Sequence, residues 1–215
     1  MKRNQSGFTL IEIAIVLVII GLLLGGVMKG QELINSAKVK NLATDFRNVP
    51  VYVYGYQDKY HAIPGDDANI ATHLSASATQ AASATAGNGV IDGQWNATGN
   101  AESHIFWEHV RLAGLAAGPT TGTPLQPVNA IGGLIGITNS GTDGPILGLP
   151  GSFIVCSNNI PGKFAQQLDI SLDDGNSQTG ALRVAPAGTA ASGVAETNAT
   201  LQANPDKPYL VCQGY

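Results

Sequence analysis

Charged residues are scarce in this chain of 215 residues: Asp, Glu, Lys and Arg together make up only 12% of it, about half the usual share of a soluble domain. Eleven basic residues stand against 15 acidic ones, so the formal net charge is −4. A protein that binds nucleic acid through its phosphates needs clustered Lys and Arg. The composition therefore argues against such a surface, and we expect no nucleic-acid partner.

Cysteine is equally scarce, with two residues, Cys156 and Cys212. In an exported domain an even pair of cysteines is typical of one disulfide. The bond would close a loop of about 57 residues and stabilise the fold by about 4 kcal/mol in the chain-entropy model. Two buried free thiols are the alternative.

The sequence also lacks the motifs of common catalytic and metal sites. None of the four histidines falls in a His-Glu-x-x-His spacing, and neither a Gly-x-Ser-x-Gly elbow nor a phosphate-binding loop occurs. We therefore do not predict an enzyme.

A long apolar run, residues 8–28, is the most distinctive feature that is present, and it contains a single charge, Glu12. As a helix, these roughly 21 residues would be about 31 Å long, the thickness of a bilayer core. Lys2 and Arg3 precede the run. Basic residues favour the cytoplasmic side, so the rest of the chain is predicted to be exported.

Glu12 is an expensive residue in this run. A carboxylate in the hydrocarbon costs on the order of 2.5–3.5 kcal/mol even on lenient scales, so a compensating partner is expected. If the chain is cut after Gly7, Phe8 gains a cationic α-amino group. Glu12 of a neighbouring copy could pair with that group.

The segment Gly7-Phe8-Thr9-Leu10-Ile11-Glu12, after its short basic leader, resembles the amino terminus of type IV prepilins and of the pseudopilins of type II secretion. The resemblance implies that a prepilin peptidase cuts between Gly7 and Phe8 and methylates Phe8. It further implies that an inner-membrane assembly platform packs the subunits into a helical filament, with Glu12 acting in assembly. Loss of the leader would remove two basic residues and bring the side-chain charge to about −6.

The resemblance predicts a structural subunit of a type IV pilus or pilus-like filament. The precursor would lie in the inner membrane with its amino terminus cytoplasmic. A type II secretion pseudopilin is the alternative, and an anchored extracytoplasmic binding domain or enzyme is a second one. An ordinary secretory signal peptide fits less well, because its apolar region is shorter and ends in a small-x-small cleavage site.

Beyond the apolar run, one helix is predicted to continue to the turn at residues 63–67. Apolar and aromatic residues recur there at alternating intervals of three and four: Val39, Leu42, Phe46, Val49, Val53, Tyr56 and Tyr60. This is one face of an α-helix, which we expect to dock into a globular head. A coiled coil is the alternative. Pro50 should kink this helix near Phe46 without ending it.

The expected organisation is therefore a leader (1–7), a membrane or filament-core segment (8–28), an amphipathic second half of the helix (29–62) and a head (63–215). Ala101–Ala117 is predicted to be a helix with Asn100 as its N-cap and with Ile105, Leu112 and Leu115 facing inward. Strands are predicted at Leu134–Thr138, Phe153–Cys156, Ala181–Val184 and Tyr209–Cys212. Together these elements predict an α+β fold, a long helix packed on a small antiparallel β-sheet.

Two oxygen-rich clusters could hold calcium, which prefers carboxylate and carbonyl oxygens at turns. One is Asp169, Asp173 and Asp174, followed by Gly175 and Asn176. The other is the run 87–93, including Asn88 and Asp92, together with Asp66 and Asp67. Neither matches an EF-hand, and the same residues are common in plain turns. Apart from calcium, no cofactor is expected. Asn96 and Asn198 begin glycosylation sequons by form.

Overall fold

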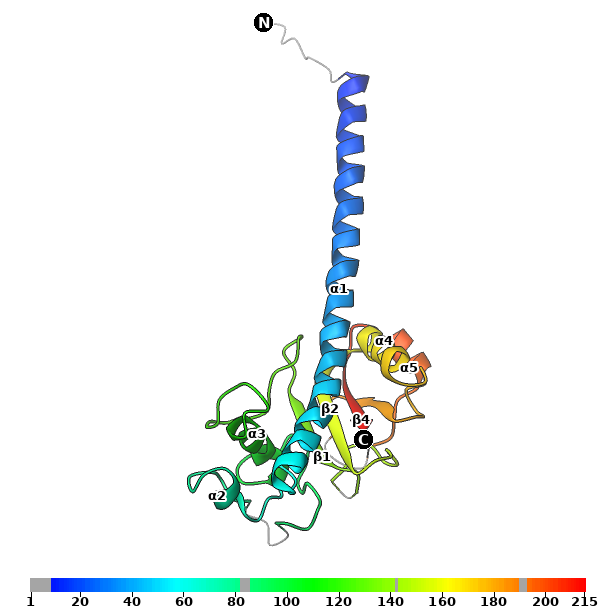
Figure 1. Ribbon diagram of the computed structural model, residues 1–215. Helices are drawn as coiled ribbons and strands as arrows, with labels where there is room; N and C mark the ends of the chain where they lie inside the picture. Colours follow the sequence, from blue (N-terminus) through cyan, green and yellow to red (C-terminus); the bar gives the residue numbers. More distant parts are fainter. Residues whose placement is uncertain (1–8, 82–85, 142, 190–192) are drawn as a thin grey trace, which may run out of the picture. The chain divides into compact units, whose positions relative to one another are not determined.

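The computed structural model describes residues 9–81, 86–141, 143–189 and 193–215. Its elements in chain order are α1 (Leu10–Tyr60), α2 (Ile70–His73), α3 (Glu102–Leu112), β1 (Ile135–Asn139), β2 (Phe153–Pro161), α4 (Gly162–Leu172), β3 (Leu182–Pro186), α5 (Asn198–Ala203) and β4 (Pro208–Gly214) (Figure 1). The chain forms two compact units, Met1–Lys38 and Val39–Tyr215.

In the second unit, the predicted apolar stripe of α1 is confirmed. Val39, Leu42, Phe46, Val49, Val53 and Tyr56 are all buried, and Tyr60, the last residue of the predicted stripe, is half-buried. They pack into the main hydrophobic core with α3, the sheet and α4. The stripe is thus covered by the same chain and needs no coiled-coil partner.

Helix α1 continues through Pro50, as predicted, and ends at Tyr60. The next residue, His61, has a φ of 53°. A residue in this left-handed conformation ends a helix, although glycine is the usual choice there. Pro64 and the turn at Gly65, whose φ is 94°, follow.

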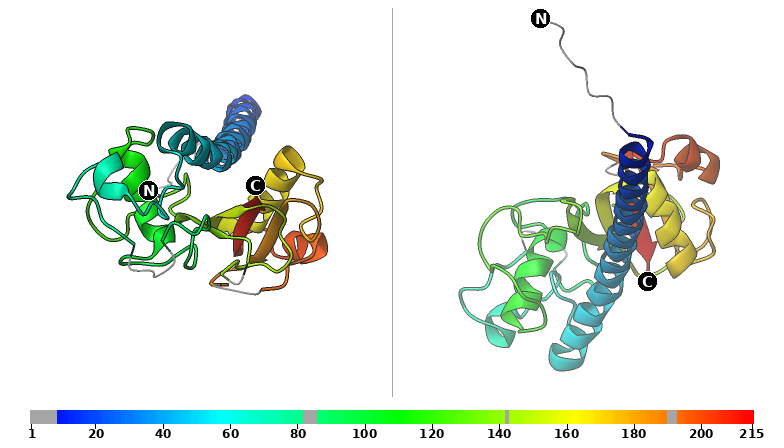
Figure 2. Two further views of the ribbon diagram at one scale, coloured as in Figure 1. Left: turned by 60° about the horizontal axis from the view of Figure 1, so that its bottom comes forward. Right: turned by 90° about the horizontal axis from the view of Figure 1, so that it is seen from above.

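The four strands of the described chain form one antiparallel sheet in the order β1-β2-β4-β3. Successive strand residues point to opposite faces. Accordingly, Val155 and Val211 belong to the main core, whereas Ile154 and Leu210 belong to a second, smaller core around Trp95. Figures 1 and 2 show α2 and α3 on one side of residues 39–60 of α1, and α4 and α5 on the other. The α+β fold class is confirmed.

The disulfide between Cys156 and Cys212 is formed. The two residues are directly opposite each other on β2 and β4, with their Cα atoms 4.1 Å apart. Both are fully buried in the second core. The predicted pairing is therefore confirmed, and it joins the two central strands of the sheet.

All four predicted strands are present, each extended or displaced by a few residues, but the prediction for residues 101–117 was partly wrong. Helix α3 ends at Leu112, and Ala101, not Asn100, is its N-cap residue. Leu112 is 39% exposed, whereas residues 102–111 are buried on every side of the helix. Gly114, with a φ of 77°, turns the chain away from the helix.

Three helices of the described chain were not predicted: α2, α4 and α5. Of these, α4 matters most, because Asp169 lies inside it and was expected in a turn. Phe164, Ala165 and Leu168 of α4 are buried against the sheet. This short apolar face is what holds Asp169 in place.

Candidate assembly helix and candidate cation cluster

Thr9 and Glu12 form a capping box at the start of α1. The Glu12 Oε2 atom accepts hydrogen bonds from the Thr9 backbone N–H (2.7 Å) and hydroxyl (2.8 Å), and the Glu12 N–H donates to the Thr9 hydroxyl at 3.3 Å. This pattern satisfies N–H groups that have no partner inside the helix. Sequence reasoning considered only the charge of Glu12 and missed Thr9, although Thr-x-x-Glu is a known start signal.

The apolar side chains that follow in the first unit are uncovered. From Leu10 to Met28 every large apolar side chain described is at least 46% exposed. The most apolar 18-residue window of α1 has a mean hydropathy of 2.8 and none of it is buried. By length and composition α1 is long and apolar enough to cross a membrane.

The apolar run ends at an exposed ion pair, in which Lys29 Nζ lies 2.6 Å from Glu32 Oε2. Such a pair contributes at most about 1 kcal/mol to stability. It marks where α1 becomes polar. Gly7 and Phe8, the predicted cleavage and methylation residues, lie outside the described residues.

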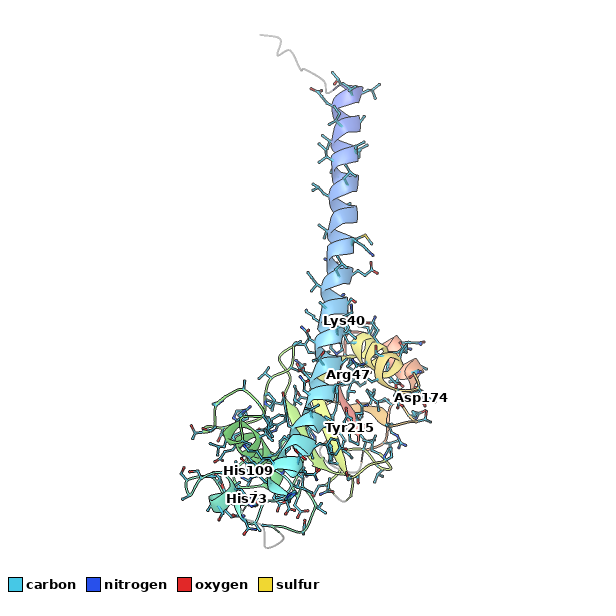
Figure 3. The ribbon with its side chains drawn as sticks, in the orientation of Figure 1. Lys40, Arg47, His73, His109, Asp174 and Tyr215 are labelled. Atoms are coloured by element: carbon cyan, nitrogen blue, oxygen red, sulfur yellow. A yellow bond between two sulfur atoms is a disulfide. The ribbon has the colours of Figure 1, made fainter. Side chains whose placement is uncertain are left out.

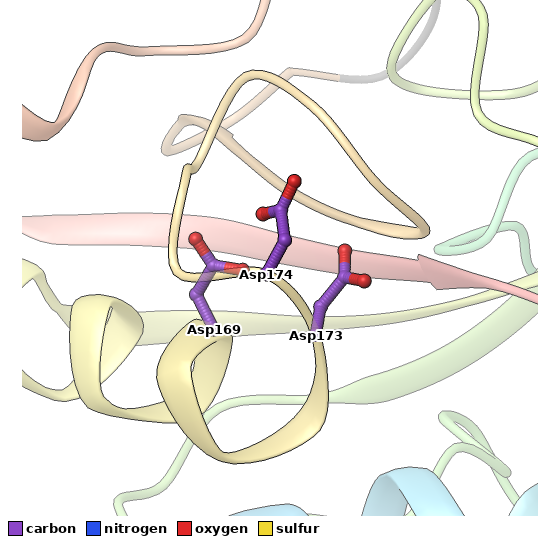
Figure 4. Close-up of side chains that lie close together, drawn as sticks. All are labelled: Asp169, Asp173 and Asp174. Atoms are coloured by element: carbon purple, nitrogen blue, oxygen red, sulfur yellow. The ribbon is translucent and has the colours of Figure 1, made fainter.

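Asp169, Asp173 and Asp174 do come together. A carboxylate oxygen from each lies within 4.8 Å of the others. Figure 4 shows the three side chains at the last turn of α4 and just beyond it, with the carboxylates of Asp169 and Asp174 turned toward each other. The last carbonyls of a helix carry partial negative charge. The end of α4 and the three acidic side chains therefore concentrate negative charge at this corner.

Asp169 is the unusual member of this cluster. It is completely buried, and among the described residues neither carboxylate oxygen has a hydrogen-bond partner. Burial raises the pKa of Asp169 to about 6, and the charges of Asp174 and Asp173 add to the effect; the nearby Gly175 N–H offsets only part of it. An unpaired buried carboxylate is costly, so this group needs a proton or a cation.

The two other carboxylates also bind groups of the protein. Asp173 Oδ2 accepts from the Leu182 N–H at 2.7 Å. Asp174 accepts from the Asn176 N–H at 2.8 Å and the Thr179 hydroxyl at 2.7 Å. These bonds fix the direction of both side chains.

The second oxygen-rich cluster has a different arrangement. The Asp66 carboxylate accepts hydrogen bonds from the backbone N–H groups of Gly87, Asn88 and Gly89. Donors aimed at a carboxylate take the place that a cation would occupy. Asp66 therefore organises the loop 86–93.

Asp67 is likewise surrounded by donors: the Tyr56 hydroxyl (2.8 Å), the Asn69 N–H (2.8 Å) and the His73 ring (Nδ1, 2.7 Å). Burial alone would raise the pKa of Asp67, but the hydrogen bonds from His73 and Tyr56 outweigh it and hold the pKa below its usual value. Asp67 and His73 border a polar hollow of about 410 Å³. The Tyr56 hydroxyl and the His73 ring both bind the same oxygen of Asp67, Oδ2.

The two sequons differ in accessibility. Asn96 is exposed. Asn198 donates from its side-chain nitrogen to the Gly175 carbonyl at 2.8 Å and accepts from the Ser177 N–H at 3.0 Å. Its amide is therefore committed to holding the loop after α4.

An apolar amino-terminal helix with one acidic residue, followed by an α+β unit with a small antiparallel sheet, defines a pilin-like architecture. In agreement, residues 2–28 match the family model described as the prokaryotic N-terminal methylation motif. The match supports a prepilin-type pilin or pseudopilin. No curated protein and no solved structure matches the chain.

Proposed function

We propose that the chain is a structural subunit of a type IV pilus or a closely related filament. A prepilin peptidase cuts the precursor between Gly7 and Phe8 and methylates Phe8. The precursor waits in the inner membrane with its amino terminus cytoplasmic. An inner-membrane assembly platform then moves it into a filament of copies of itself or of related pilins.

One observation carries this proposal: Glu12 is the only charge in an apolar run whose side chains are all exposed in the described chain. The capping box satisfies helix N–H groups, but among the described residues no positively charged side chain pairs with Glu12. In a filament the Phe8 amino group of the next copy supplies the counter-charge. At about 4 Å and an effective dielectric of about 20, the pair gains roughly 4 kcal/mol of gross attraction, part of which desolvation cancels.

Two substitutions separate charge from capping. Glu12→Gln keeps an oxygen that accepts from the Thr9 N–H, because Gln serves in a capping box as Glu does, but it removes the charge. Glu12→Lys would place a positive side chain next to the positive Phe8 amino group of the next copy. We expect membrane content to stay near the wild-type level in both variants, while the yield of sheared filaments falls with Gln and falls further with Lys. Glu32→Gln, on the same helix, is the matched control.

Normal filament yield from Glu12→Lys would contradict the pairing role. If Glu12→Ala leaves both assembly and function intact, the helix is a plain tether and the anchored-domain alternative is favoured. Complementation of pilus and of type II secretion mutants separates a pilin from a pseudopilin.

We also propose that Asp169, Asp173 and Asp174 hold a calcium ion. The supporting observation is the buried carboxylate of Asp169, which has no hydrogen-bond partner in the described part of the chain and faces two further carboxylates. Carboxylate oxygens of this kind suit Ca²⁺. The ion would join the end of α4 to the loop that leads to β3.

Calcium titration of the chelator-treated full chain in detergent tests this second proposal. A ligand at about 100 times its Kd stabilises the folded state by about 2.7 kcal/mol, so the unfolding midpoint should rise with Ca²⁺. Asp169→Asn should abolish the rise, and Asp58→Asn, an exposed control, should not. If wild type shows no rise and Asp169→Asn raises the midpoint, Asp169 is simply a protonated buried acid.

A further inference from the structure

Pro50 leaves a defect in the hydrogen bonding of α1. In an α-helix each N–H donates to the carbonyl four residues earlier. Proline has no N–H, and its ring crowds that carbonyl. Pro50 lies inside α1, so the carbonyl without its helical partner is that of Phe46. Both residues are buried in the second unit, where an unpaired carbonyl is costly.

Tyr215 supplies the missing donor. Its hydroxyl lies 2.7 Å from the Phe46 carbonyl oxygen, a contact between residues 169 positions apart. Figure 3 shows Tyr215 beside the turn of α1 that carries Arg47. The hydroxyl is also 3.0 Å from the Gln213 side-chain oxygen. Since a hydroxyl has one proton, we assign that proton to the shorter of the two contacts, the one with Phe46.

Tyr215 is held on both its ring and its backbone. Its ring stacks on Phe153 at 5.6 Å between centroids. Its N–H donates to the Phe153 carbonyl at 2.9 Å, and its carbonyl accepts from the Ser152 N–H at 2.5 Å. Burial raises the pKa of Tyr215 above its usual range, so its hydroxyl remains a donor at physiological pH. The side chain is therefore fixed in place by contacts that do not involve α1.

We propose that Tyr215 is a clasp that replaces the N–H missing at Pro50 and holds this turn of α1 against the sheet. Tyr215 follows β4, whose Cys212 is bonded to β2. The clasp thus connects the turn of α1 that lacks a backbone N–H to the strand that carries the disulfide. Opening of α1 at Pro50 requires the bond between the Tyr215 hydroxyl and Phe46 to break.

A double-mutant cycle on the full chain in detergent tests the clasp. Tyr215→Phe removes only the hydroxyl, and Pro50→Ala restores a backbone N–H at that position. Hydrogen–deuterium exchange of the peptide covering residues 46–54 reports opening. A neutral hydrogen bond is worth about 0.5–1.5 kcal/mol, so Tyr215→Phe should speed exchange about two- to tenfold. In the Pro50→Ala background the same change should have less than about a twofold effect, because the restored N–H now donates to the Phe46 carbonyl.

Tyr54→Phe is the matched control, since Tyr54 also lies edge-on to Phe153 but is 55% exposed. It should leave exchange of this peptide unchanged. The proposal is overturned if Tyr215→Phe accelerates exchange equally in both backgrounds, which would make it a general packing effect. It is also overturned if Tyr215→Phe changes nothing in the chain that retains Pro50.

Discussion

Buried ionisable residues of the Val39–Tyr215 unit make its stability depend on pH. Glu102, at the first turn of α3, is 1% exposed. One of its oxygens accepts from the Asp92 N–H at 2.8 Å, and the other is buried without a partner among the described residues. Burial raises the pKa of Glu102 to about 7. The folded state therefore holds this proton more tightly than the unfolded chain does.

The sign of the effect follows from linkage. The stability contributed by protonated Glu102 is fully present below pH 4.5 and is lost as pH rises through about 7. The free energy of unfolding of wild type should therefore fall between about pH 5 and pH 8. In Glu102→Gln this fall should be smaller by on the order of 1 kcal/mol. Urea titrations at both pH values, with exposed Asp58→Asn as the control, measure this. An unchanged pH slope would show that Glu102 does not titrate there.

His109 is a buried residue whose role is structural. Its Nδ1 atom accepts from the Gly65 N–H at 2.9 Å, and its Nε2 atom lies 2.9 Å from the Thr79 carbonyl. Burial lowers the pKa of His109, so the neutral ring with a proton on Nε2 makes both bonds. The ring thereby fixes the turn after α1 and the segment before residue 82 against α3.

His109→Ala should lower the free energy of unfolding by about 2–4 kcal/mol, because it leaves one buried donor and one buried acceptor unpaired. Exposed His61→Ala, beside the same turn, should cost far less. In wild type, stability from neutral His109 should be present above pH 6.5 and decline as pH falls below it. Equal losses for the two alanine variants would contradict the account.

At the scale of elements, the sheet depends on its central pair of strands. Cys156 and Cys212 cross-link β2 and β4 in register. Replacing both by Ala should lower the free energy of unfolding by up to about 4 kcal/mol. Urea unfolding of the double variant against oxidised wild type measures this. Wild type treated with reductant is the companion sample, and it should resemble the variant; equal stability of all three would rule out a stabilising role.

Elements with a long periodic pattern could be predicted from the sequence. The stripe from Val39 to Tyr56 is long enough to show a helical period, and each strand has a compact apolar run. Helix α4 was missed because its apolar face is short and lies between Pro161 and an Asp-rich turn. Asp169 was accordingly placed in a loop, although the three acids were correctly grouped.

Apart from the disulfide between Cys156 and Cys212, the hydrogen bonds between distant residues named here could not be predicted. The bond from Tyr215 to Phe46 and that from His109 to Gly65 depend on how the chain folds back, and no local pattern encodes them. The capping box of Thr9 and Glu12 is local and could have been found. The end of α1 at Tyr60 was predicted a few residues too late, because His61 adopts a left-handed conformation that glycine usually adopts.

At the scale of the whole molecule, two kinds of evidence meet at the amino terminus. The methylation motif covers residues 2–28, and α1 begins within it at Leu10. The Val39–Tyr215 unit has an α+β fold, and its main core includes the buried stripe of α1. The match to the methylation motif therefore concerns the first helix and not the Val39–Tyr215 unit.

Mass spectrometry of the chain recovered from sheared filaments tests the central claim most directly. If the chain is a processed filament subunit, it will be found there with an N-methylated Phe8 as its first residue and with Met1 to Gly7 absent. Membrane fractions from a strain without prepilin peptidase are the control, and they should contain only the uncut form. Recovery of filament material that still begins at Met1, or absence of the chain from filaments that are otherwise intact, would contradict the account.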